Sequence, residues 1–216
     1  MIIAVDAVGG DHYPTSPVKG AVQAVEENEE LQVILLGPEE LVTEELEKYE
    51  HPQGRVIVQH APDIVGMNDS PSQVIKTKKE SSIALGLGMI KAGQCHGFVS
   101  AGNTGALLAA STFILGKLDG VLRPTISASY PTIHGIRLML DVGANLEIRP
   151  EMYRQFAQMG LIYAEHVMGI DNPRVGLLNV GEEEEKGTEI VREAYRELQG
   201  QPNFVGNLEG RDVLFG

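Results

Sequence analysis

The strongest constraint on the fold is a repeated order of a short apolar run, a turn and a segment with helical periodicity. Apolar runs at residues 2–6, 32–36, 55–59 and 97–100 have the length and composition of strands that are buried on both faces. Strands that alternate with helices predict an α/β fold with three layers, in which a mostly parallel sheet carries helices on both faces. We expect residues 1–216 to form one α/β domain.

Several helix starts are marked by residues that favour the first turn. Ser-Pro pairs at 16–17 and 70–71, and Pro150, fit the N-cap and the first helical position. Apolar residues at helical spacing follow these signals. The helices expected from such signals cover residues 16–28, 38–49, 70–79, 82–91, 106–115, 150–167 and 188–198.

The second half of the chain adds a different strand arrangement. Residues 125–130 and 136–141 are predicted to pair around a turn at 132–135. Residues 174–179 are a further expected strand, and another begins at residues 203–206. We therefore expect a hairpin in addition to the parallel strands.

Residues 92–116 contain no Asp, Glu, Lys or Arg, and this length exceeds the roughly 20 residues that span a bilayer. Glycines, Gln94 and Asn103 interrupt the segment, so we expect a short strand, a glycine loop and a buried helix instead. The N-terminal apolar run lacks the basic start of a signal peptide and is broken by Asp6. The single cysteine, Cys95, excludes an internal disulfide and a cysteine-cluster metal site, which is typical of the reducing cytoplasm.

The charge balance argues against a chain-wide interaction with nucleic acid. The sequence has 17 Lys and Arg against 30 Asp and Glu, for a formal net charge of −13. A nucleic-acid surface needs an excess of basic residues. The acidic excess lies mainly in residues 26–50 and 182–197, so the rest of the chain is balanced enough to hold local anion sites.

The segment S-A-G-N-T-G at residues 100–105 follows a predicted strand, where parallel sheets bind their ligands. Gly102, Asn103, Thr104 and Gly105 are small or polar, so backbone N–H groups can approach an anion at the following helix start. The alternative is a glycine turn that serves only close packing of helix and sheet. Both interpretations fit the sequence.

Lys186 lies near a predicted helix start, where the helix dipole disfavours a cation. It is either held there for a ligand or simply solvated beside the four glutamates at 182–185. The chain has no G-x-G-x-x-G after a strand, no P-loop, no H-E-x-x-H and no G-x-S-x-G. Lys186 is therefore a candidate outside the common motifs.

Three further polar residues follow predicted strands. Asp141 and Asn145 place an acid and an amide at a strand end, with a glycine between them. His12 follows the first strand and could act as an acid or base near neutral pH, although a turn residue is the ordinary explanation. Cys95 precedes a strand instead of opening a helix, which disfavours a nucleophilic role.

Lys76, Lys78 and Lys79 form the densest basic cluster of the sequence. A solvated helix face is the ordinary explanation for such a cluster. On an acidic chain, the same lysines could dock an acidic partner.

Six motifs in order resemble the bacterial PlsX family of phosphate acyltransferases. They are VDAVGGDHYP at 5–14, MNDSPSQVIKTKKESS at 67–82, FVSAGNTGALLAA at 98–110, LMLDVGANLEIRPE at 138–151, VGLLNVGEEEEKGTE at 175–189 and NFVGNLEGRD at 203–212. The resemblance covers the whole sequence. Val8 stands where the family often has methionine, and residues 147–149 vary the segment after D-V-G-A-N.

The resemblance implies a fold similar to isocitrate and isopropylmalate dehydrogenases and to phosphotransacetylases. It implies an enzyme without cofactor or metal that transfers the acyl group of acyl-[acyl-carrier protein] to inorganic phosphate, for phospholipid synthesis. It also implies a homodimer in the cytoplasm, peripheral at the inner face of the membrane. Lys186 corresponds to the family's active-site lysine and Gly102–Gly105 to its glycine loop. The family chain continues beyond Gly216 with a D-G-F-x-G-N motif, so we expect part of the fold to be missing here.

The expected roles follow from this chemistry. Asn103 and Thr104 would hold phosphate, Lys186 would neutralise charge, and Asn145 would orient a substrate. Asp141 and His12 are further candidates for substrate binding, and the three lysines at 76–79 for carrier-protein docking. The alternatives are a catalytically incomplete binding or assembly protein and an NAD-dependent dehydrogenase on a similar fold.

Overall fold

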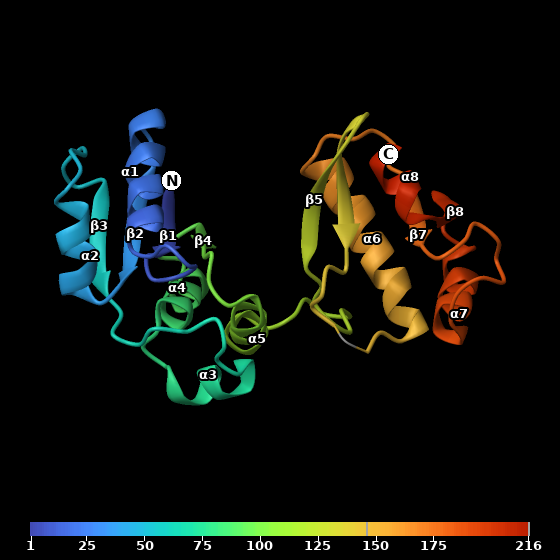
Figure 1. Cartoon of the computed structure of the whole chain (residues 1–216), viewed down its shortest axis with the longest axis horizontal. Helices are drawn as coiled ribbons and strands as arrows, with labels where there is room; N and C mark the ends of the chain where they lie inside the picture. Colours follow the sequence, from blue (N-terminus) through green and yellow to red (C-terminus); the bar gives the residue numbers. More distant parts are fainter. Residues whose placement is uncertain (146, 216) are drawn as a thin grey trace. The chain divides into compact units, whose positions relative to one another are not determined.

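A computed structural model describes residues 1–145 and 147–215 (Figure 1). The chain divides into two compact units, Met1–Gly116 and Lys117–Gly216, and each is described by itself. Residues 146 and 216, which fall within the motif at 138–151 and at the end of the expected single domain, lie outside the described residues. The single α/β domain over 1–216 stays a prediction.

The first unit contains a parallel sheet and five helices. Its elements are β1 (Ile2–Asp6), α1 (Thr15–Glu27), β2 (Gln32–Gly37), α2 (Glu39–Leu46), β3 (Val56–His60), α3 (Pro71–Thr77), α4 (Ser82–Lys91), β4 (Gly97–Val99) and α5 (Thr104–Ile114). The strand order is β3-β2-β1-β4, and all three pairings are parallel. The carboxyl ends of β1 and β4 are therefore neighbours, which is where parallel sheets place their ligands.

Alternate residues of these strands face two different apolar clusters. Val33 and Leu35 of β2 pack with α1 and α2, whereas Leu36 of the same strand packs with Ala4 and with Met89 of α4. Successive side chains of a strand point to opposite faces, so this division puts helices on both faces of the sheet. The expected mostly parallel α/β fold is confirmed, and in this unit the three layers are present.

A third apolar cluster joins the helices α3, α4 and α5. Val74 of α3, Ile83 and Leu87 of α4, and Ala106 and Ala110 of α5 are buried in it. The small residues of α5 bring it close to its neighbours. The N-terminus of α5 is therefore fixed by packing on α3 and α4.

The second unit combines a hairpin with a βαβ unit. Its elements are β5 (Ser127–Thr132), β6 (Gly135–Leu140), α6 (Pro150–His166), β7 (Val175–Leu178), α7 (Glu189–Leu198), β8 (Phe204–Leu208) and α8 (Gly210–Phe215). β5 and β6 pair antiparallel, as expected, and β7 and β8 pair parallel. Apolar residues of α6, α7 and the β7–β8 sheet form an apolar cluster in this unit.

Several helix boundaries differ from the expectation, and the largest difference is at α2, which ends at Leu46 instead of residue 49. α1 begins at Thr15 because the turn before it continues into the helix: the N–H of Ser16 donates to the carbonyl of His12 at 2.9 Å. α3 ends at Thr77, and α5 begins at Thr104, two residues earlier than predicted. Thr104 and Gly105 therefore belong to the first turn of α5.

The charge-free stretch from residue 92 to 116 folds as expected into β4, a glycine loop and the 11-residue helix α5. The helix is less buried than predicted, because only Ala106 and Ala110 of α5 are buried and Phe113 is 74% exposed. In the part of the chain that the structure describes, no helix has both the length and the apolarity needed to cross a bilayer.

Candidate functional site

Asp6 organises the carboxyl end of the first sheet. Its side chain is only 3% exposed, and its Oδ2 accepts a hydrogen bond of 2.7 Å from the Ser100 hydroxyl. Its Oδ1 accepts from the N–H of Val8 at 3.2 Å. The Ser100 oxygen in turn accepts from the N–H of Gly102 at 3.0 Å. These bonds join the turn after β1 to the loop after β4.

Glycine is required at Gly9, and little room remains for a side chain at Gly102, where these segments meet. A Cβ atom on Gly9 would lie 2.5 Å from Asp6 Oδ2 and 2.9 Å from the backbone N of Gly102. A Cβ atom on Gly102 would lie 3.1 Å from both Asp6 Oδ2 and Ser100 Oγ. A larger side chain at Gly9 would therefore push the two segments apart. Sequence reasoning identified this glycine loop but not the buried Asp6–Ser100 pair that holds it.

The side chain of Asn103 is engaged within the protein. Its Oδ1 accepts from the N–H of Ala106 at 2.9 Å, which makes Asn103 the N-cap of α5. Its Nδ2 lies within hydrogen-bond distance of three carbonyl oxygens, those of Gly66, Met67 and Asp69, at 3.0–3.2 Å. The Asn103 amide thus anchors α5 to the segment before α3.

Thr104 and Gly105 present the first turn of α5. The first N–H groups of a helix have no acceptor inside the helix. Asn103 supplies acceptors for the N–H groups of Ala106 and Leu107, which leaves those of Thr104 and Gly105 available. A Cβ atom on Gly105 would lie 2.9 Å from Pro71, so glycine is needed for close packing as well. Both interpretations of the glycine loop fit this geometry.

His12 lies in the turn before α1 with its side chain exposed. Its carbonyl oxygen accepts the N–H of Ser16, so the backbone of His12 helps to start α1.

The three lysines at 76–79 differ in their surroundings. Lys78 forms an ion pair with Asp69 and donates to the carbonyl of Ile64 at 2.6 Å. The hydrogen bond from Lys78, followed by the one from the Gly66 N–H, holds the pKa of Asp69 below its ordinary value. Of the three lysines predicted to dock a partner, Lys78 is therefore engaged within the unit, whereas the side chains of Lys76 and Lys79 are exposed.

In the second unit, Asp141 is the centre of the loop after β6. It accepts from the Thr125 hydroxyl at 2.9 Å and from the N–H groups of Ile126 at 3.0 Å and Asn145 at 2.8 Å. Partial burial raises the pKa of Asp141, but these hydrogen bonds outweigh it and the pKa lies below its ordinary value. Asp141 is thus held as a carboxylate that shapes the loop.

Asn145 is brought together with Asp141, as its motif suggested. Its Nδ2 donates to the carbonyl of Pro124 at 3.0 Å and lies 3.3 Å from Asp141 Oδ2. The amide nitrogen is therefore engaged within the unit. The described contacts leave the amide oxygen as the group that can meet a ligand.

Lys186 lies on an exposed loop before α7. Its side chain is 52% exposed, and its Nζ lies 3.9 Å from Glu183 Oε2. Asn179 Nδ2 donates to the carbonyl of Lys186 at 3.1 Å, and Arg192 donates to that of Gly187 at 2.7 Å. The backbone around Lys186 is fixed, whereas its ammonium group is accessible. No hydrogen bond or ion pair joins it to Asp141 or Asn145 among the described residues.

Asn207 of β8 is a residue that sequence reasoning missed. It is 6% exposed, and its Nδ2 donates to the carbonyl of Glu183 at 2.9 Å. Its Oδ1 is buried without a hydrogen-bond partner in the described structure. Through its bond to Glu183, Asn207 anchors the loop that carries Lys186. Its position at the carboxyl end of β8 is the sequence signal that could have identified it.

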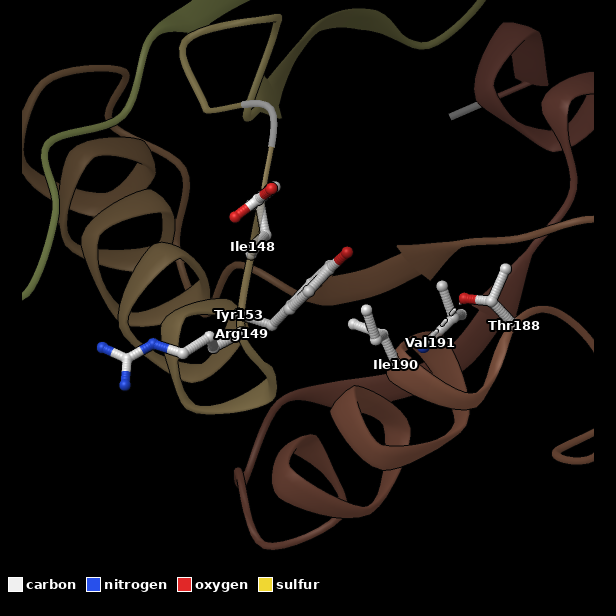
Figure 2. A pocket seen from close by; sticks show the side chains of 7 residues that line it. Ile148, Arg149, Tyr153, Thr188, Ile190 and Val191 are labelled. Carbon is white, nitrogen blue, oxygen red and sulfur yellow. Dashed lines mark hydrogen bonds between the residues drawn. The ribbon is translucent and has the colours of Figure 1, made fainter.

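An open cleft of about 530 Å³ lies between the starts of α6 and α7. It is lined by Glu147, Ile148, Arg149, Tyr153, Thr188, Ile190 and Val191. Figure 2 shows Tyr153 extending from α6 toward Ile190 and Val191 of α7, while the guanidinium of Arg149 is directed away from them. Within residues 1–145 and 147–215, no three His, Cys, Asp or Glu side chains gather closely enough to hold a metal ion.

Comparisons with known proteins agree on the family and the fold. A family model described as "Fatty acid synthesis protein" matches residues 1–216. A phosphate acyltransferase of Halothermothrix orenii is 44% identical over 219 residues, covering 100% of this chain and 66% of that protein. One of Desulfitobacterium hafniense is 47% identical over 217 residues, covering 100% of this chain and 64% of the relative. The chain therefore spans about two thirds of the length of these curated relatives.

A phosphotransacetylase of Streptococcus pyogenes has a similar fold. The TM-score is 0.69 at 15% sequence identity, covering 97% of this chain and 68% of that one. At this identity the likeness concerns the fold alone. The sequence matches carry the assignment of family, and the chain belongs to the fatty acid synthesis protein family, among relatives named phosphate acyltransferases.

Proposed function

We propose that this chain transfers an acyl group from acyl-[acyl-carrier protein] to inorganic phosphate, which supplies acyl phosphate for phospholipid synthesis. The observation that carries the proposal is the 44% identity, over the whole chain, to a relative named phosphate acyltransferase. In the reaction, a phosphate oxygen bonds to the thioester carbonyl carbon and the C–S bond breaks. The carrier thiolate leaves with the electron pair and takes a proton from water.

The chemistry needs charge neutralisation more than a strong base. Phosphate is already anionic at neutral pH, and the leaving thiol has an ordinary pKa of roughly 8.5. The protein therefore has to position two reactants and stabilise negative charge. Exposed cations and unpaired backbone N–H groups suit this task.

The first turn of α5 is the proposed phosphate site. The N–H groups of Thr104 and Gly105 and the positive end of the helix dipole would contact the anion. Asn103 has a positioning role in this proposal because its amide is engaged with Ala106 and the segment before α3. The exposed His12 would donate to a phosphate oxygen.

Lys186 is the proposed catalytic cation. Its ammonium group is accessible on a loop whose backbone is fixed, so it can neutralise phosphate or the oxyanion of the tetrahedral intermediate. The amide oxygen of Asn145 would accept a hydrogen bond from a substrate and so orient it. Asp141 would hold the loop of Asn145 in place.

The finer features of the family belong to the same proposal. They are a fold like that of isocitrate and isopropylmalate dehydrogenases, a homodimer, and a cytoplasmic location at the inner face of the membrane. Lys76 and Lys79 would dock the acidic carrier protein.

The test uses the 216-residue chain with acyl-[acyl-carrier protein] in the presence and absence of inorganic phosphate. Hydroxylamine traps acyl phosphate as a hydroxamate, and phosphate-dependent hydroxamate is the expected product. Thioester that stays intact with phosphate present would overturn the proposal and favour a binding or assembly protein. Reduction of NAD by candidate hydroxy acids would instead favour a dehydrogenase.

A further inference from the structure

The cleft between α6 and α7 is a cavity to which the proposed reaction has so far given no role. Its volume of about 530 Å³ lies in the range of small-molecule sites, about 300–1,000 Å³. Ile148 and Tyr153 form its wall on the α6 side, and Ile190 and Val191 form its wall on the α7 side (Figure 2). All of these residues belong to the second unit.

The facing walls of the cleft are apolar. Ile190 is 47% exposed at the start of α7, although Ala194, which lies one turn later on the same side of that helix, is fully buried. Tyr153 is partly buried, and this burial raises the pKa of its hydroxyl. An apolar ligand between Tyr153 and Ile190 would remove this surface from water.

One end of the cleft lies at the start of α7. On the α6 side, Glu147 and Arg149 also line the cleft, but Arg149 forms an exposed ion pair of 3.1 Å with Glu151 and its guanidinium is directed away from Ile190 and Val191 (Figure 2). Thr188 is the N-cap of α7, and the accessible Lys186 lies two residues before it. Helix starts favour negative charge. An aliphatic chain therefore matches the walls of the cleft, and a negatively charged end would lie beside the start of α7.

We propose that the cleft between α6 and α7 binds the aliphatic chain of the acyl group that is transferred. The inference rests on the proposed function and names the subsite that holds the substrate's apolar part. The chain would lie between Tyr153 and Ile190, with its carboxyl-derived end toward the loop of Lys186. Water around the acyl chain would be displaced, so longer chains should bind more tightly until the cleft is filled.

The absence of tryptophan from the sequence allows a direct test. Ile190→Trp would place a single indole in the cleft, and Ile162→Trp would place one on α6, where Ile162 is 58% exposed and does not line the cleft. A bromine-substituted fatty acid, used below its micelle concentration, quenches indole fluorescence on contact. We expect quenching that saturates for Ile190→Trp and only weak, linear quenching for Ile162→Trp.

A second pair of variants tests the same site without an indole. Ile190→Glu introduces a charge into the apolar wall, and Ile162→Glu is the matched control. We expect Ile190→Glu to weaken binding of a radiolabelled fatty acid at least tenfold, with Ile162→Glu unchanged. Both sites are exposed, and circular dichroism verifies that each variant is folded.

Equal quenching at both indoles, or unchanged fatty-acid binding by Ile190→Glu, would overturn the assignment of the cleft. These measurements need neither phosphate nor turnover, so they are independent of the hydroxamate assay. Saturable quenching without phosphate-dependent hydroxamate would leave the acyl site standing and remove the proposed reaction. Hydroxamate formation without saturable quenching would leave the proposed reaction standing and remove the acyl site from the cleft.

Discussion

Individual polar residues divide into those that hold the loops and those that remain accessible to a ligand. Asp6, Asn103 and Asp141 are occupied by hydrogen bonds within their own units. Lys186 and the exposed His12 keep their charged or titratable groups in solvent. We therefore expect ligands to contact accessible side chains such as Lys186 and His12, while the buried polar residues hold the loops in place.

Replacing Lys186 with alanine should lower turnover at least tenfold. This loss corresponds to about 1.4 kcal/mol of transition-state stabilisation, since the ammonium group would no longer neutralise the developing negative charge. The measurement is the rate of phosphate-dependent hydroxamate formation. Lys19→Ala, which removes an exposed lysine of α1, is the matched control and should not change the rate. Equal rates for Lys186→Ala and the parent chain would remove Lys186 from the mechanism.

Replacing Asp141 with asparagine should destabilise the protein in a pH-dependent way. The variant loses hydrogen bonds to a carboxylate, which typically costs about 1–3 kcal/mol of unfolding free energy. The folded-state pKa of Asp141 is lowered, so its stabilisation is present above the unfolded pKa of about 3.9 and is lost as pH falls through the folded value.

The check is denaturant unfolding of the parent and of Asp141→Asn from neutral to acidic pH. The difference in unfolding free energy should be largest near neutrality and shrink below about pH 4. A difference that stays constant across this range would contradict the role of the ionised carboxylate.

Helix boundaries were predicted correctly where residues close in sequence determine them. α4 begins and ends where expected because its signal is local: Ser81 accepts from the N–H of Ala84 at 3.3 Å. α1 starts early because a turn closed by the carbonyl of His12 runs into it, which capping rules do not describe. Local signals could be predicted, and continuous turns could not.

The start of α5 depends on contacts that are distant in sequence. Asn103 both caps the helix and binds carbonyls at residues 66–69, more than 30 residues earlier. Sequence spacing placed the glycine loop beside a helix, but it could not show that the Asn103 amide is already engaged. The engaged amide is the reason why we propose a positioning role for Asn103.

Asn103→Ala should destabilise the first unit more than an ordinary N-cap deletion. Loss of the cap costs about 1 kcal/mol, and three carbonyls deprived of their donor bring the expected total to about 2–4 kcal/mol. Thr188→Ala is the comparison, because Thr188 caps α7 through one described bond to the N–H of Val191 and should cost about 1 kcal/mol. Denaturant unfolding measures both, and equal losses would argue against the anchoring role.

Reversing the charges of Lys76 and Lys79 should weaken carrier-protein binding and reduce its dependence on salt. Both lysines are exposed at or just after the end of α3, and surface ion pairs with an acidic partner are screened by salt. Lys78 is left intact because it pairs with Asp69. Binding of acyl-[acyl-carrier protein] at two salt concentrations is the measurement, with Lys19→Glu as the control. Unchanged affinity and salt dependence would place docking elsewhere.

For the whole molecule, the sequence predicted the fold class, whereas the single domain over residues 1–216 stays a prediction. The alternation of strands and helices correctly indicated mostly parallel pairing, because periodicity reports which residues are buried. The described strands nevertheless form three sheets, and the chain divides near residue 116. Asn207 was missed for a similar reason, since its role depends on the distant loop at 181–187.

Limited proteolysis should first cleave the chain between its two units. Lys117 is exposed and follows Gly116, whose φ of +88° marks a turn outside any helix or strand. Proteases cut exposed, irregular segments in preference to helices, and trypsin cleaves poorly at Arg123 because Pro124 follows it. We expect cleavage after Lys117 to give the first two fragments, which intact mass identifies.

Lys117→Gln should slow this cleavage, whereas Lys19→Gln on α1 should not. Early cleavage inside α1 or α3 would mean that the first unit does not hold together through its own apolar clusters.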